Sequence, residues 1–175
     1  MKLHIGCGNR VIHGFVHVDV LPLAHLGARA RVDALPFSDG AFELAYASHV
    51  LEHFGRHEQR AVLAEWRRIL APGGWLRVAV PDFGAVWEAY PAFGLDAVTG
   101  LVVGGQKDAY DFHKMIFDRV SLTRALEDTG FVEVREWDWR ATEHAGVDDY
   151  SQAYLPHLDK VAGRLMSLNL EARRG

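Results

Sequence analysis

Residues 3–9 read Leu-His-Ile-Gly-Cys-Gly-Asn, and this stretch decides the fold that the sequence predicts. A buried strand that ends in Gly-x-Gly turns sharply, and its backbone can approach a bound molecule closely because no Cβ is in the way. Residues 15–20, Phe-Val-His-Val-Asp-Val, form a second strand pattern that ends in a carboxylate. In nucleoside-binding α/β folds an acid at this point accepts hydrogen bonds from the ribose hydroxyls, so the sequence predicts that role for Asp19.

The glycine stretch resembles the cofactor loop of the class I S-adenosylmethionine-dependent methyltransferases, in particular the small type 11 members. In that family the loop reads acid-x-Gly-x-Gly-x-Gly. Gly6 and Gly8 match the first two glycines, whereas His4 replaces the acid and Arg10 replaces the third glycine. Only ten residues separate Gly8 from Asp19, so the helix that the family usually has between its first two strands is expected to be reduced to a turn or two, or lost.

An NAD-dependent oxidoreductase is the first alternative, and the spacing disfavours it. The dinucleotide fingerprint Gly-x-Gly-x-x-Gly needs a third glycine, where this chain has Val11, and roughly 20 residues before the acid.

The length, composition and charge of the chain limit the classes of function that it can have. The 175 residues fit one domain, residues 1–175, and 49% of them are hydrophobic. The net charge of −4 argues against general nucleic-acid binding, which calls for a basic surface. The single cysteine, Cys7, cannot form an internal disulfide, and neither a leader nor an apolar run of about 18 residues is visible. We expect a cytoplasmic protein without membrane insertion, either a monomer or a homodimer.

Alternating strand and helix patterns predict a doubly wound α/β fold. Further strands are predicted at Ala30–Ala34, Phe42–Ser48, Trp75–Val80, Phe131–Asp138 and Met166–Arg173, and helices at Arg56–Leu70, Gly84–Tyr90 and Val120–Thr129. Pro72-Gly73-Gly74 is expected to end the first of these helices, and Gly100–Gly105 to form a mobile loop. The resemblance implies a mostly parallel, Rossmann-like sheet with a late antiparallel strand. Residues 140–165 show no clear pattern.

The predicted binding residues follow the strands, because ligands of α/β sheets bind at the carboxyl ends of the strands. The resemblance implies S-adenosylmethionine as the cofactor and Asp33 as the contact to the adenine amino group; a solvated acid that caps a turn is the alternative for Asp33. The expected cofactor-binding residues are Gly6, Cys7, Gly8, Asn9, Asp19, Val20, Asp33, Ala34, Leu35, Ser48 and His49. Cys7 fits a tight loop better than it fits a reactive nucleophile.

If the segment that contains histidines 49, 53 and 57 is helical, the three side chains lie on one face at four-residue steps. Residues 49–53 match the His-x-x-Glu-His pattern of zinc peptidases, but they follow a central strand and the sequence shows no third ligand. We therefore expect neither a peptidase nor a bound metal. Some relatives hold a divalent metal with a similar Glu-x-x-Glu-His arrangement, and the simpler interpretation is that Glu52 and His53 orient the loop by hydrogen bonds.

A general base is needed if the acceptor is a hydroxyl, and a histidine titrating near neutral pH is suited to this task. The predicted catalytic residues are His113, His49 and His53. His113 is favoured because the resemblance places its segment over the methyl group, and because Asp111 could orient its imidazole.

The function that this sequence predicts is transfer of a methyl group from S-adenosylmethionine to a small-molecule acceptor by in-line displacement. Relatives with this glycine-loop style suggest a sugar or a lipid or polysaccharide precursor. Aligning the two reactants can supply ~7–11 kcal/mol, so the protein needs little covalent chemistry. The other alternative is a protein that binds the cofactor, or its demethylated product, without turnover.

Overall fold

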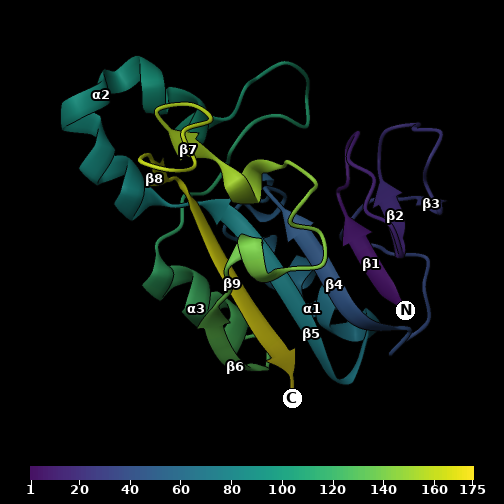
Figure 1. Ribbon diagram of the computed structural model, residues 1–175. Coiled ribbons are helices and arrows are strands. Elements are labelled where there is room, and N and C mark those ends of the chain that lie inside the picture. The colour runs from purple at the N-terminus through teal and green to yellow at the C-terminus, as the bar shows by residue number, and fades with distance from the viewer.

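The computed structural model describes residues 1–175 and contains a seven-stranded sheet in the order β3-β2-β1-β4-β5-β9-β6 (Figure 1). Its strands are β1 (Lys2–Ile5), β2 (Phe15–Asp19), β3 (Ala28–Arg29), β4 (Phe42–Ser48), β5 (Leu70–Pro81), β6 (Phe131–Glu136) and β9 (Ser167–Arg174). β9 runs antiparallel to both of its neighbours, and the pairs among β3, β2, β1, β4 and β5 are parallel. This arrangement confirms the predicted mostly parallel sheet with a late antiparallel strand.

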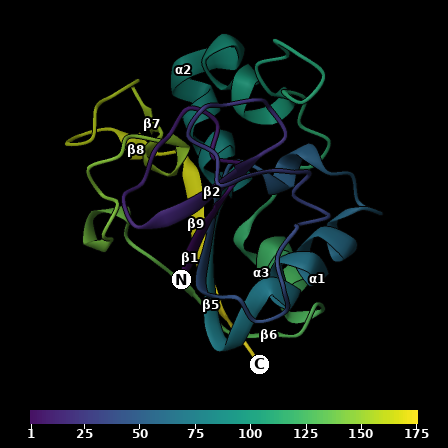
Figure 2. The ribbon, with the colours of Figure 1, turned by 90° about the vertical axis from the view of Figure 1, so that its right-hand side faces the viewer.

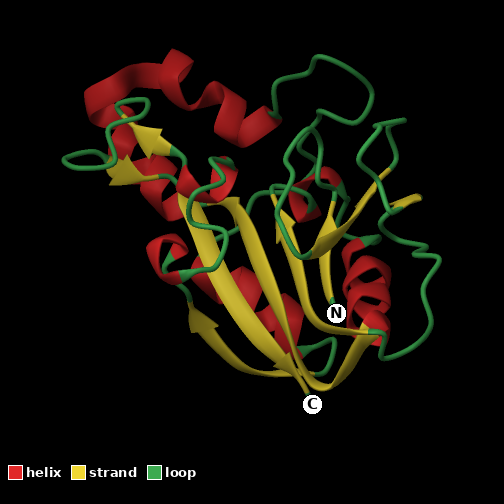
Figure 3. Cartoon of the chain, turned by 45° about the vertical axis from the view of Figure 1, so that its right-hand side comes forward, coloured by secondary structure: helices red, strands yellow, loops and turns green.

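Three helices and several short elements complete the chain. The helices are α1 (Gln59–Ile69), α2 (Phe83–Val103) and α3 (Arg119–Glu127); the 3₁₀ turns are η1 (Leu51–His53), η2 (Trp139–Ala141) and η3 (Tyr150–Gln152); and β7 (Tyr154–Leu155) pairs with β8 (Arg164–Leu165). Figure 3 shows that α2 and several loops lie beyond the carboxyl ends of the parallel strands. None of the helices combines the length and the apolar character that crossing a membrane requires.

One face of the sheet carries the main core. α1 and α3 lie side by side on this face (Figure 2). The helical spacing of Val62, Trp66 and Ile69 gives α1 its apolar stripe, and all three are at most 1% exposed. The Trp66 indole also donates a 2.9 Å hydrogen bond to the carbonyl of Val32. The core therefore ties α1 to the chain that follows β3.

The opposite face of the sheet carries polar side chains beside a small apolar cluster that includes Leu44, Tyr46 and Trp137, and a mostly irregular segment, residues 137–153, packs on it. Tyr46 of β4 donates a 2.6 Å hydrogen bond to Asp149, and Asn169 of β9 donates one of 2.9 Å to the carbonyl of Ser151. These partners satisfy polar groups that would otherwise be costly to bury.

No helix lies between β1 and β2, which confirms the expectation from the short spacing. The third strand was predicted two residues too late: β3 spans Ala28–Arg29, because β2 ends at Asp19 and offers no partner beyond that point. Residues 31–34 instead form a turn, in which the amide of Ala34 bonds the carbonyl of Arg31 at 3.2 Å.

Two glycine-rich stretches bear on the predicted ends of helices. α1 ends at Ile69, one residue before the predicted end, and Pro72-Gly73-Gly74 follows within β5, opposite an irregularity in its pairing with β4. A Cβ on Gly74 would lie 2.9 Å from the carbonyl oxygen of Ala71, so only glycine fits there. The predicted mobile loop at Gly100–Gly105 is helical as far as Val103, and Gly104, at φ 82°, ends α2.

Candidate functional site

The glycine loop begins directly after β1. Gly6 and Gly8 have φ values of 62° and 49°, a left-handed conformation that glycine adopts most readily. The amides of Gly6 and Cys7 both donate to the carbonyl of Val18, at 2.9 and 3.2 Å, so the loop turns over the end of β2. A Cβ on Gly6 would lie 2.5 Å from a methyl group of Val50, whereas one on Gly8 would meet nothing within 4 Å. The loop therefore packs on the segment after β4 at Gly6 and faces open space at Gly8.

Alanine substitutions should separate these two positions. Both glycines carry the left-handed penalty of about 1–2 kcal/mol, but only Gly6→Ala adds a clash with Val50. Gly6→Ala is expected to lower the free energy of unfolding by about 1–3 kcal/mol more than Gly8→Ala does. Urea unfolding of the two variants measures the difference. Equal losses of unfolding free energy would show that the Val50 side chain moves aside to admit the new methyl group.

Asp19 anchors the loop. The amides of Gly8 and Leu21 donate to its two carboxylate oxygens at 2.8 and 2.9 Å, and the residue is 7% exposed. A carboxylate oxygen has two lone pairs, so each oxygen keeps one acceptor position. The predicted ribose acceptor thus lies beside the open side of the loop, already fixed in orientation by backbone donors.

Cys7 is buried, and its thiol lies 3.6 Å from the ring of His25. Burial, together with the nearby Asp19 carboxylate, raises the pKa of this thiol to about 12. The thiol therefore stays protonated at neutral pH, which agrees with a structural residue in a tight loop.

Asp33 pairs with a neighbour on the surface. The Arg31 guanidinium donates to both of its oxygens, at 2.9 and 2.6 Å, and this contact holds the pKa of Asp33 below its usual value. An adenine contact by Asp33 stays a prediction.

The remaining predicted cofactor residues differ in exposure. Ala34 and Asn9 are exposed, and Val20 is half-buried. Leu35 is 5% exposed and belongs to the main core, so its side chain is a packing group. The hydroxyl of Ser48 accepts a 3.1 Å hydrogen bond from the amide of Ser151, a contact that the sequence did not indicate.

A cluster of three histidines around one glutamate follows β4. Glu52 is 0% exposed, and neither of its carboxylate oxygens has a hydrogen-bond partner. His49 Nδ1 and His113 Nε2 lie 3.3 and 3.9 Å from Glu52 Oε1. The rings of His53 and His113 are 5.0 Å apart, edge to face. The structure therefore brings all three predicted catalytic histidines together.

Burial sets the protonation of this cluster. It raises the pKa of Glu52 to about 8, and it lowers the pKa of His49 to about 3, with the neighbouring His113 and His53 adding to the effect. Burial and the proximity of His53 also lower the pKa of His113. At neutral pH His49 is therefore uncharged, and Glu52 mostly holds its proton unless a cation lies beside it.

Backbone contacts hold His113 in place. The amides of Lys114 and Met115 donate to the carbonyl of Glu52, at 2.8 and 3.2 Å. The expected orienting role of Asp111 is wrong, because its carboxylate instead accepts from the amides of Gly105 and Lys107, both at 3.3 Å. Histidines 49, 53 and 57 do not share one helix, because η1 spans only Leu51–His53.

Two further residues lie at this site that the sequence did not mark as site residues. The ring of Tyr150 lies 5.2 Å from that of His49, and the Ser167 hydroxyl lies 3.3 Å from His49 Nε2. His49 itself has a φ of 53°, a left-handed conformation that is rare outside glycine. Strain of this kind is typical of functional sites.

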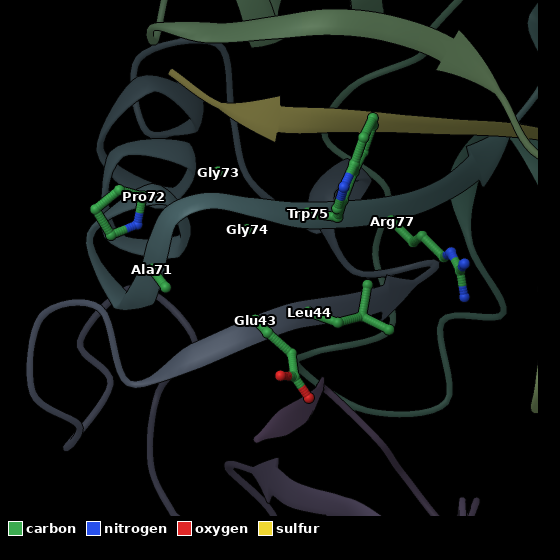
Figure 4. A pocket seen from close by; sticks show the side chains of 8 residues that line it. All are labelled: Glu43, Leu44, Ala71, Pro72, Gly73, Gly74, Trp75 and Arg77. Atoms are coloured by element: carbon green, nitrogen blue, oxygen red, sulfur yellow. The ribbon is translucent and has the colours of Figure 1, made fainter.

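One surface cavity lies elsewhere. It has a volume of about 380 Å³ and is lined by Glu43, Leu44, Ala71, Pro72, Gly73, Gly74, Trp75 and Arg77 (Figure 4). These residues belong to the amino-terminal parts of β4 and β5, whereas ligands of parallel sheets bind at the carboxyl ends. We therefore place the candidate site at the glycine loop and the histidine cluster.

Comparisons with curated proteins give matches over part of the chain. A family model described as "Methyltransferase domain" matches residues 25–78. The chain is 31% identical over 124 residues to the ubiquinone/menaquinone biosynthesis C-methyltransferase UbiE of Cupriavidus taiwanensis, and 30% identical to the protein of the same name from Cupriavidus pinatubonensis. Each match covers 65% of this chain and 49% of the relative, so the chain spans about half the length of these relatives.

Similar solved structures cover nearly the whole chain. An S-adenosylmethionine-dependent methyltransferase from Methanosarcina mazei has a TM-score of 0.61 at 16% identity and covers 99% of this chain and 91% of its own. The 1,6-didemethyltoxoflavin-N1-methyltransferase of Burkholderia thailandensis, solved with S-adenosylhomocysteine, has a TM-score of 0.58 at 15% identity and covers 99% of this chain and 70% of its own. At this level of identity the likeness shows a shared fold.

Proposed function

We propose that this chain is a class I S-adenosylmethionine-dependent methyltransferase that transfers a methyl group from S-adenosylmethionine to a small-molecule acceptor. The observation that carries the proposal is where the glycine loop lies. The chain winds outward from β1 to β3 and then returns to β4, so β1 and β4 are neighbours at the point where the strand order reverses. Cofactors of α/β sheets bind in the crevice at such a point.

The residues present there fit the cofactor. The open space at Gly8 admits a ligand close to the backbone, and the Asp19 carboxylate keeps two acceptor positions for the ribose hydroxyls. His4, in place of the family's acid, is 2% exposed within the sheet and stacks on Tyr46. The amino group of the methionine part must therefore be held by another residue.

The cofactor brings an electrophilic methyl group, and the chain's own task is to position the acceptor and exclude water. The cluster of His49, His53 and His113 around Glu52 follows β4 at the same edge of the sheet. We propose that it lines the acceptor side of the crevice. The net charge of −4 favours a small molecule over nucleic acid, and a sugar or a lipid or polysaccharide precursor is the acceptor class we propose. The free thiol of Cys7 suits a reducing compartment such as the cytoplasm.

Binding of S-adenosylmethionine or S-adenosylhomocysteine tests the proposal first. At about 100 times its dissociation constant either ligand should stabilise the protein by roughly 2.7 kcal/mol and raise its melting temperature by several degrees. NAD serves as the matched control and should leave the melting temperature unchanged. A stabilisation by NAD alone would contradict the proposal and favour the oxidoreductase.

Transfer itself is tested with a radiolabelled methyl group and a panel of sugars, nucleotide sugars, lipid precursors and quinones. Labelled product from one class is the expected result. Tight cofactor binding with no transfer to any class would support the alternative, a protein that holds the cofactor without turnover.

A further inference from the structure

We propose that Glu52, His53 and His113 form a binding site for one divalent cation of the first transition series, such as Zn²⁺ or Mn²⁺. One ligand atom from each residue lies within 4.8 Å of the other two. Two imidazoles and one carboxylate are a common ligand set for such cations. The proposal departs from the expectation of no metal, because the structure supplies the third ligand that the sequence did not show.

The first argument is the carboxylate. Glu52 is 0% exposed, and neither oxygen has a hydrogen-bond partner. Burying a charge without a partner is among the most costly arrangements in a protein interior. The backbone around Glu52 is firmly held, since its carbonyl accepts from the amides of Lys114 and Met115. A fixed carboxylate without a hydrogen-bond partner is satisfied by a proton or by a bound cation, and the chain places none of its lysines or arginines against it.

The second argument is the orientation of the two imidazoles. His53 Nδ1 lies 3.1 Å from the carbonyl oxygen of Phe112, and His113 Nδ1 lies 3.1 Å from that of Leu101. A carbonyl oxygen only accepts, so each Nδ1 carries the ring proton and each Nε2 presents a lone pair. Metal-binding histidines are typically held in this way, with one ring nitrogen on a backbone carbonyl and the other on the metal.

The third argument is the position of the imidazole lone pairs relative to the Glu52 carboxyl group. His113 Nε2 lies 3.9 Å from Glu52 Oε1, so two acceptors face each other whenever Glu52 is ionised. A cation that binds both atoms removes this conflict. Three protein ligands also leave positions on the cation for a water molecule or an oxygen of the acceptor.

Metal analysis and titration test the proposal without any methyl transfer. Protein stripped with a chelator and dialysed should bind one Zn²⁺ or Mn²⁺ per chain in a calorimetric titration. Glu52→Gln and His113→Ala should each weaken binding by more than the roughly 10–100-fold that the loss of an outer partner costs. His57→Ala is the matched control, because His57 is an exposed histidine of the same segment, and it should bind like the parent.

Two further measurements keep the outcome clear. His53 is half-buried and the easiest of the three to replace, so His53→Gln gives a folded variant if the others do not fold. Co²⁺ should give visible absorption bands in the parent that are absent in His53→Gln. Absence of binding in the titration, or binding that survives all three substitutions, would overturn the proposal. Either result leaves the cofactor-binding measurement, made separately with S-adenosylhomocysteine, unaffected.

Discussion

Replacing Asp19 by alanine is expected to weaken binding of S-adenosylhomocysteine by about 1.5–3 kcal/mol, which is roughly a 10- to 150-fold loss of affinity. The substitution removes the proposed acceptor of the ribose hydroxyls. It also leaves the amides of Gly8 and Leu21 without their carboxylate partner, so the glycine loop loses its anchor. Calorimetric titration measures the affinity. Asp128→Ala is the control, because Asp128 is an exposed carboxylate at the end of α3, and it should bind like the parent.

Loss of the anchor and loss of the ribose contact can be separated. In the parent, the 2′-deoxy analogue of S-adenosylhomocysteine should bind more weakly than the complete ligand. In Asp19→Ala this difference should shrink, because the two changes remove the same interaction. If Asp19→Ala binds the complete ligand as tightly as the parent does, Asp19 is not the ribose acceptor.

The parts of the fold that the sequence predicted well depend on local signals. β4 spans Phe42–Ser48 as predicted, and α3 begins at a capping box of Asp118 and Ser121 and ends before Gly130. Periodicity and end signals act over a few residues, so they can be recognised without the tertiary structure. The strand predicted at Ala30–Ala34 was wrong because its position depends on a distant neighbour. β2 ends at Asp19, and this end decides where β3 stops.

The candidate site was predictable only in part. The glycine loop and Asp19 form a motif of fixed spacing, and the structure brings them into contact. The approach of His113 to Glu52 joins residues 61 positions apart, and no local pattern reports it. Residues 140–153, which make up most of the segment on the opposite face of the sheet, likewise show no clear sequence pattern. Along the strands, the polar positions that this segment covers alternate with apolar ones. This alternation indicates a sheet with one partly polar face, but it does not indicate which segment packs on that face.

Acid should destabilise this protein strongly, and His4 is one identifiable cause. Its ring is 2% exposed in the sheet, and its Nδ1 has no partner. Burial, with smaller effects from His17, His144 and His25, lowers the pKa of His4 from 6.5 to about 3. Between these two values the unfolded chain binds a proton that the folded chain does not. The free energy of unfolding therefore falls as the pH falls, by about 1.4 kcal/mol per pH unit from this group.

His4→Phe should remove that dependence. The phenyl ring can keep the stacking on Tyr46, whose ring lies 5.2 Å away, but it takes up no proton. Urea unfolding between pH 4 and pH 7 should give a slope against pH that is smaller than the parent's by about 1.4 kcal/mol per unit, with the gap widest at the acidic end. His57→Phe, at an exposed position, should keep the parent's slope. Parallel curves for His4→Phe and the parent would mean that His4 takes up its proton without unfolding the sheet, and that another buried group determines the acid sensitivity.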